Sequence, residues 1–214
     1  MPLATLPSPT PTPDELDDLI YFSRTGDLDS LRDLISELCK RHACPPAVIL
    51  ASAIDVDAEG LGSQSSLLHY PAANGNLKVV QFLLSQLTGP GSSGANGTIA
   101  GESAPDLVNH RNVNGNTPLH WAGMNGHLEV VKVLVGAGAD PTIVNGAGKD
   151  AVVESEASAK EGARECADWM LKNCDGLDKG IGGAKEEEGP AVDEYESGPT
   201  TSAAQKLPED GPRA

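Results

Sequence analysis

Two histidines with similar neighbours are the first residues whose types and spacing could do chemistry. His69 ends the tetrapeptide "SLLH" and His120 ends "TPLH". An imidazole can serve as a general base, a proton shuttle or a metal ligand near neutral pH. However, no nucleophile or second base can be assigned to work with either ring. We therefore expect both histidines to be structural, each forming hydrogen bonds with the backbone between neighbouring units of the fold.

A second candidate centre is the group Cys39, His42 and Cys44. These side chains could bind zinc, but their spacing differs from that of paired zinc ligands, and no second ligand pair follows. We favour a helix end that carries free thiols. The glycine-rich tract at 89–97 contains no lysine and opens no helix, so it is not a phosphate-binding loop. We therefore expect no enzymatic activity, no metal and no cofactor.

The elements around the two histidines repeat. The stretch "SLLHYPAANGNLKVVQFLL" (66–84) aligns with "TPLHWAGMNGHLEVVKVLV" (117–135) at an offset of 51 residues. The segment 88–105 between them has 18 residues rich in Gly, Ser and Pro, which is a flexible-linker composition. Without that insert the step is 33 residues, the period of ankyrin repeats.

The better copy explains the repeat in physical terms. Thr117 is suited to cap a first helix, and Pro118 follows at the position where a missing N–H costs nothing. Ala122 and Gly123 are small enough to let neighbouring first helices approach closely. Gly126 suits a tight turn between two helices, because glycine adopts positive φ readily. The pattern predicts a helix-turn-helix unit.

The predicted fold is all-α, an ankyrin-repeat solenoid of about four helix-turn-helix units with β-turn fingers and disordered termini. The units are expected at about 14–40, 55–87, 106–138 and 145–174, with a short additional helix after the first. The predicted domains are a disordered Pro-rich N-terminus (1–12), the ankyrin-repeat domain (13–174, with a flexible insert at 88–105) and a disordered acidic tail (175–214).

Pro71 lies in the first helix of the second unit, where the better copy has Ala122. Proline removes one N–H donor and crowds the carbonyl four residues earlier. We favour a tolerated distortion close to the helix start. The alternative is a functional kink that tilts Tyr70 and Asn74 toward a ligand.

The overall charge restricts the class of partner. The formal net charge is −16, and residues 1–174 alone carry 21 acids and 11 bases. Such a chain is unsuited to binding bare nucleic acid, which requires Lys and Arg to neutralise phosphates. The sequence contains no apolar run long enough to span a membrane, and its N-terminus lacks the features of a signal peptide. Four cysteines without paired short spacings favour a reducing compartment. A basic protein is the partner that suits this charge.

The predicted binding surface combines the fingertips with the exposed positions of the first helices. Tyr70 and Trp121 fall at equivalent places in the repeat, although both could instead pack between helices. The acids could make this surface negative or could simply be solvated. The candidate residues are Asp55, Asp57, Glu59, Tyr70, Asn74, Asn114, Asn116, Trp121, Met124, Asn125 and Glu154.

Four stretches resemble the small fungal yeast-ankyrin-repeat family across residues 19–174: "SRTGDLDSLRDLI", "GNTPLHWAGMNGHLEVVKVLV", "ADPTIVN" and "GKDAVVESEASAKE". Members of that family are dedicated chaperones of the KH-domain protein of the small ribosomal subunit, small-subunit ribosomal protein three. The resemblance implies a non-enzymatic escort that keeps a free basic ribosomal protein soluble in the cytoplasm and nucleus. It also implies a monomer that forms a heterocomplex with this client.

Two other classes of function stay open on the sequence alone. One is a generic ankyrin-repeat adaptor or regulator in a proteasome, transcription or signalling complex, which predicts a less acidic surface. The other is the regulatory subunit of an enzyme, which requires a catalytic partner.

Overall fold

The computed structural model describes residues 9–56, 62–87 and 107–177. The chain divides into two units, Met1–Ile181 and Gly182–Ala214, and all described residues belong to the first. The predictions for the insert 88–105 and for most of both termini lie outside the described residues, as do Asp57 and Glu59.

Helices account for almost all regular structure in the described residues, where the only β pairing is an isolated bridge between Ile54 and Ser66. In chain order the helices are α1 (Pro13–Thr25), α2 (Leu28–His42), α3 (Pro46–Ser52), α4 (His69–Asn74), α5 (Leu77–Leu87), α7 (Pro118–Met124), α8 (Leu128–Gly136), α9 (Ala151–Ala157) and α10 (Ala163–Asn173).

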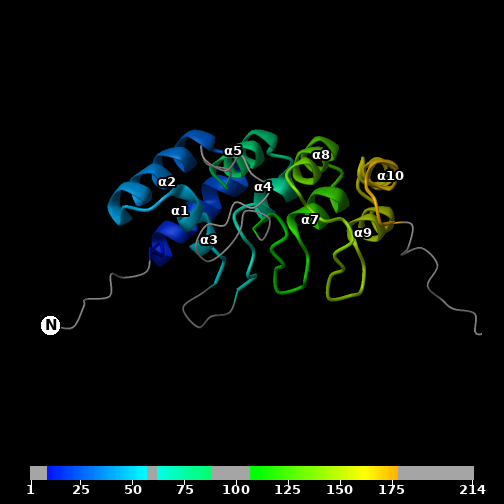
Figure 1. The fold of residues 1–214 in the computed structure, drawn as a ribbon, viewed down its shortest axis with the longest axis horizontal. Helices are drawn as coiled ribbons and strands as arrows, with labels where there is room; N and C mark the ends of the chain where they lie inside the picture. The colour runs from blue at the N-terminus through cyan, green and yellow to red at the C-terminus, as the bar shows by residue number, and fades with distance from the viewer. Residues whose placement is uncertain (1–8, 57–61, 88–106, 178–214) are drawn as a thin grey trace, which may run out of the picture. The chain divides into compact units, whose positions relative to one another are not determined.

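These helices form four antiparallel pairs that follow one another in chain order (Figure 1). The first helices make one layer, in which α1 contacts α4, α4 contacts α7 and α7 contacts α9. The second helices α2, α5, α8 and α10 make the other layer. The short helix α3 packs against α2 and α5, where an additional helix was predicted. The all-α ankyrin-repeat prediction is confirmed.

Local signals in the third unit act as predicted. Thr117 caps α7, and Pro118 is its first residue. Gly126 has a φ of +79°, and a Cβ at this position would overlap the carbonyl oxygen of Glu161. A Cβ at Gly123 would overlap Ser155 Oγ of α9, so this glycine permits the close contact between α7 and α9. Both glycines are therefore required by their surroundings.

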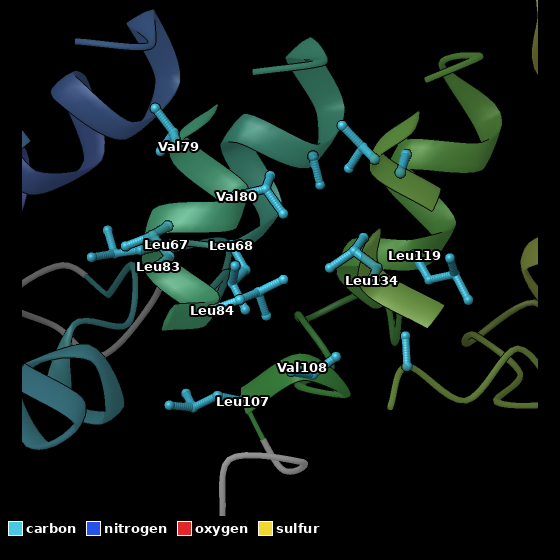
Figure 2. Packing of buried hydrophobic residues seen from close by; sticks show 14 of the residues in the cluster. Leu67, Leu68, Val79, Val80, Leu83, Leu84, Leu107, Val108, Leu119 and Leu134 are labelled. Carbon is cyan, nitrogen blue, oxygen red and sulfur yellow. The ribbon is translucent and has the colours of Figure 1, made fainter. Parts of the chain in front are cut away.

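The core runs continuously between neighbouring units. Figure 2 shows Val80 and Leu84 on the side of α5 that faces the third unit, where Leu134 of α8 lies. Leu107 and Val108, which precede the second finger, are buried in the same cluster. Because each unit shares its apolar residues with its neighbour, a single unit could not bury its own hydrophobic face.

Pro71 is the third residue of α4 and is buried. It therefore lies in the first helical turn, which agrees with a distortion that is tolerated close to the helix start. The kink alternative is wrong for Tyr70, because only 7% of this residue is exposed. Asn74 is exposed, but its Nδ2 donates a hydrogen bond to the Arg24 carbonyl oxygen at 2.9 Å.

Candidate protein-binding surface

Three loops extend from the first-helix layer, and we call them fingers one, two and three. Finger one comprises residues 53–68, of which 57–61 are outside the described residues; finger two comprises 109–117, and finger three 138–150. The Val113 N–H donates to the Ser63 carbonyl oxygen at 2.9 Å, and the Gly146 N–H donates to the Asn114 carbonyl oxygen at 2.8 Å. These backbone bonds align the three fingers side by side.

Two asparagines 33 residues apart shape fingers two and three. Asn112 Oδ1 accepts hydrogen bonds from the backbone N–H groups of Asn114 and Asn116, each at 3.0 Å. Asn145 Oδ1 does the same for Ala147 and Lys149, at 2.9 and 3.1 Å. Sequence reasoning overlooked this pair. The signal was present, since each asparagine stands three residues before a glycine of the 33-residue step.

The two histidines are structural, as predicted. His69 Nδ1 accepts from the Ser66 backbone N–H at 3.1 Å, so Nε2 carries the proton and donates to the Asn116 carbonyl oxygen at 3.0 Å. His120 repeats this arrangement with Thr117 and the Lys149 carbonyl oxygen. Burial lowers the pKa of His69 to about 4, and it lowers the pKa of His120 as well. Both rings stay neutral and connect each first helix to the next finger.

Asp55 and Tyr70 hold finger one against α4. The Tyr70 hydroxyl donates to Asp55 Oδ2 at 2.5 Å, and the Ser63 hydroxyl donates to the same oxygen at 2.5 Å. Burial, followed by the hydrogen bond with Asp55, raises the pKa of Tyr70 to about 12. Of the two alternatives for Tyr70, an exposed position or packing between helices, the structure shows a packed ring. Asp55 is half-buried and Tyr70 is buried, because the finger folds back onto its own helix.

Trp121 of α7 packs between two units and is also partly accessible. Its ring meets His69 edge-on at a centroid distance of 5.4 Å and Tyr70 at 6.2 Å. Trp121 is nevertheless only half-buried. One part of the indole packs between units, and the remainder is accessible.

The other predicted positions lie along fingers two and three and at the adjoining helix ends. Asn114 is exposed, whereas Asn116, Met124 and Asn125 are half-buried. Asn125 Nδ2 donates to the Trp121 carbonyl oxygen at 2.9 Å, and Asn116 Oδ1 accepts from Asn145 Nδ2 at 2.8 Å. These amides thus support the surface as well as lining it.

Glu154 belongs to α9 and is also held in place. Its carboxylate accepts from Asn145 Nδ2 at 2.8 Å and lies 3.9 Å from Lys149 Nζ. The two candidate acids that the structure describes, Asp55 and Glu154, therefore belong to different units, and local donors engage both. Neither of these two acids is simply solvated, and the other two candidate acids, Asp57 and Glu59, lie outside the described residues.

Exposed apolar side chains lie on all three fingers. Val113 in finger two is 58% exposed, Val144 in finger three is 46% exposed, and Val56 in finger one is 42% exposed. Each finger thus presents one accessible valine among its described residues. Their positions do not coincide in the repeat alignment, so the repeat by itself does not predict all three.

Cys39 and Cys44 are free, half-buried thiols. Burial and the neighbouring Cys44 raise the pKa of the Cys39 thiol, which leaves it a poor nucleophile. Within residues 9–56, 62–87 and 107–177, no group of three or more His, Cys, Asp or Glu side chains is arranged to hold a metal ion. None of the helices in these ranges is long and apolar enough to cross a bilayer.

Comparisons with known proteins also find ankyrin repeats in this chain. The family model for ankyrin repeats matches residues 19–145 with three copies. The ankyrin repeat-containing protein YAR1 of Saccharomyces cerevisiae is 36% identical over 163 residues, which cover 76% of this chain and 70% of that protein. The chain belongs to the YAR1 family of ankyrin-repeat proteins.

A solved structure is also similar to this YAR1-family chain. It is the crystal structure of the yeast ribosomal protein Rps3 in complex with its chaperone Yar1, with a TM-score of 0.59 and 36% identity. The match covers 76% of the present chain and 94% of the chain it matches. By contrast, the similarity to the mouse palmitoyltransferase ZDHHC13 (37% identity) covers 83 residues, which are 11% of that protein.

Proposed function

We propose that this YAR1-family chain is a non-enzymatic chaperone that binds a free basic protein of the small ribosomal subunit, the counterpart of Rps3, and prevents its aggregation. The single observation that carries the proposal is the match to the yeast Rps3–Yar1 complex, which covers 94% of the matched chain. This match covers 76% of the chain, whereas the similarity to the palmitoyltransferase ZDHHC13 covers only 83 residues of it.

The charge and the finger surface support the same proposal. A chain with a net charge of −16 attracts a basic client from a distance and speeds its association. Val56, Val113 and Val144 offer apolar contacts, one from each finger. Backbone bonds between the fingers pre-organise these contacts, which reduces the entropy that binding costs.

The experiment is co-purification of the full chain with the small-subunit ribosomal protein three of the same organism. We expect a soluble complex of one copy each, weakened at 500 mM salt relative to 100 mM because the attraction is partly electrostatic. A second basic ribosomal protein of similar size serves as the control for charge alone.

Two outcomes would contradict the proposal. One is equal binding of both ribosomal proteins, which would indicate non-specific charge attraction. The other is aggregation of the client, measured by light scattering, at the same rate with and without the chain.

We further propose that the chain is present in both the cytoplasm and the nucleus, since its client is made in one compartment and assembled into ribosomal subunits in the other. Fluorescence microscopy of a tagged chain tests this. Strict confinement to another compartment would refute it.

A further inference from the structure

A groove lies in the second-helix layer, whereas the fingers extend from the first-helix layer. It lies between α2 and α5, with the start of α3 at one end, and has a volume of about 490 Å3. Arg32, Ile35 and Lys40 line it from α2, Phe82 and Gln86 from α5, and Pro46 from α3. A groove of this size is in the range that binds ligands or peptide side chains.

The charge of this groove is opposite to that of the protein. Its lining contains two cations and, among the residues the structure describes, no carboxylate, although the whole chain carries −16. Lys40 forms no ion pair with any described residue. Among the described residues, Arg32 forms an ion pair with Asp29 alone, at 3.2 Å, and the Asp29 side chain is 91% exposed. Such an exposed pair contributes little and is readily exchanged for another carboxylate.

The two cations lie at a fixed spacing along α2. The Arg32 guanidinium lies over the Phe82 ring, 5.4 Å from its centroid, and this cation–π contact favours a position at the groove. Lys40 lies eight positions after Arg32 on α2, which corresponds to about 12 Å along the helix axis. Between them lies the apolar floor formed by Ile35 and Phe82.

This spacing matches an extended peptide. Residues i and i+4 of a strand are about 13 Å apart and point to the same face, together with residue i+2. We propose that the groove binds an extended acidic segment of a partner protein with the pattern acid–x–apolar–x–acid. The two carboxylates meet Arg32 and Lys40, and the central apolar side chain packs on Ile35 and Phe82. This partner is distinct from the basic client, so the inference goes beyond the proposed function.

The test uses the full chain and a fluorescein-labelled peptide, acetyl-Ser-Glu-Ser-Phe-Ser-Glu-Ser-amide, in an anisotropy titration. At 150 mM salt the Debye length is about 8 Å, so repulsion by distant acids is screened while contacts in the groove persist. We expect saturable binding that weakens at least tenfold in each of Lys40→Glu and Arg32→Glu. The matched control is Lys78→Glu, which makes the same charge change at an exposed α5 residue outside the groove and should alter binding less than twofold.

A register control tests the geometry. The peptide acetyl-Ser-Ser-Glu-Glu-Phe-Ser-Ser-amide has the same composition but places its glutamates side by side, on opposite faces of an extended chain. We expect it to bind at least fivefold more weakly. Equal binding of both peptides, an equal loss in the Lys78→Glu variant, or no saturable binding by the wild-type chain would overturn the proposal.

Client binding separates this inference from the proposed chaperone function. The Lys40→Glu variant should bind the ribosomal protein as the wild type does, because Lys40 lies on the second-helix layer. Loss of peptide binding with retained client binding supports a second site. Loss of both in this variant, with an unchanged melting temperature, would mean that the groove belongs to the client surface and would overturn a separate acidic partner.

Discussion

The Ser23 hydroxyl of α1 donates a buried hydrogen bond of 2.7 Å to the carbonyl oxygen of Leu67. In a regular helix this carbonyl would accept from the N–H of residue 71, four positions later, but Pro71 has none. The Ser23 side chain of the preceding unit thus supplies the donor that proline lacks. The proline is tolerated because the stacking of two units supplies the missing bond.

This relationship predicts a coupling between Ser23 and Pro71. Ser23→Ala should destabilise the wild type by about 1–3 kcal/mol, because a buried carbonyl loses its donor. In a Pro71→Ala background the helix N–H can replace the hydroxyl, so the same change should cost less. Urea unfolding of the four proteins in a double-mutant cycle measures the difference. Equal costs in both backgrounds would show that the two positions are independent.

The bond between Tyr70 and Asp55 predicts that Asp55 stabilises the fold. Asp55→Ala should lower the free energy of unfolding by about 1.5–3 kcal/mol, the range for hydrogen bonds to a charged group. Asp17→Ala on the exposed side of α1 is the control and should change it by less than about 0.5 kcal/mol. Asp55→Ala and Tyr70→Phe should not be additive, since they remove one shared bond. Additive costs, measured by urea unfolding, would rule out this role.

Trp121 is expected to contribute to both stability and binding. Trp121→Ala should destabilise the protein by about 2–3 kcal/mol, below the 3–5 typical of fully buried aromatics because the ring is only half-buried. It should also weaken client binding by about 2 kcal/mol if the accessible edge contacts the client. Calorimetric titration at a temperature where the variant is folded separates the two effects. Unchanged client affinity would restrict Trp121 to the core.

The lowered pKa of His69 predicts a loss of stability in acid. The unfolded chain takes up a proton near pH 6.5, whereas folded His69 does so only near pH 4. The stabilising contribution is therefore complete above pH 6.5 and declines as the pH falls toward 4. By pH 5 the loss from this residue should be on the order of 2 kcal/mol. The free energies of unfolding at pH 7.5 and pH 5 should differ less in the His69→Gln variant than in the wild type. An equal difference in both proteins would show that His69 does not cause the loss.

Two glycines should respond oppositely to alanine. Gly126→Ala forces a side chain into positive φ and against the Glu161 carbonyl, so we expect a loss of more than about 3 kcal/mol. Gly136 is the last residue of α8, and a Cβ there meets nothing within 4 Å. Gly136→Ala should be neutral or stabilising by up to about 1 kcal/mol. Thermal unfolding of both variants tests the contrast, which a tolerated Gly126→Ala would contradict.

Much of the fold could be predicted because its signals are local. The cap at Thr117, the proline that follows it and the turn at Gly126 act within a few residues of themselves, and the 33-residue step repeats them. The roles of His69 and His120 followed from the same local context. Sequence alone therefore determined the helix-turn-helix units, their order and the family to which the chain belongs.

The accessibility of individual side chains was decided only by the tertiary structure. Asp55 and Tyr70 are 15 residues apart, and no local rule states that finger one folds back to join them. Likewise, Arg32 and Phe82 meet only because α2 and α5 stack. The physical reason is that periodicity specifies which face of a helix is buried, whereas burial and partners depend on contacts between residues far apart in the chain.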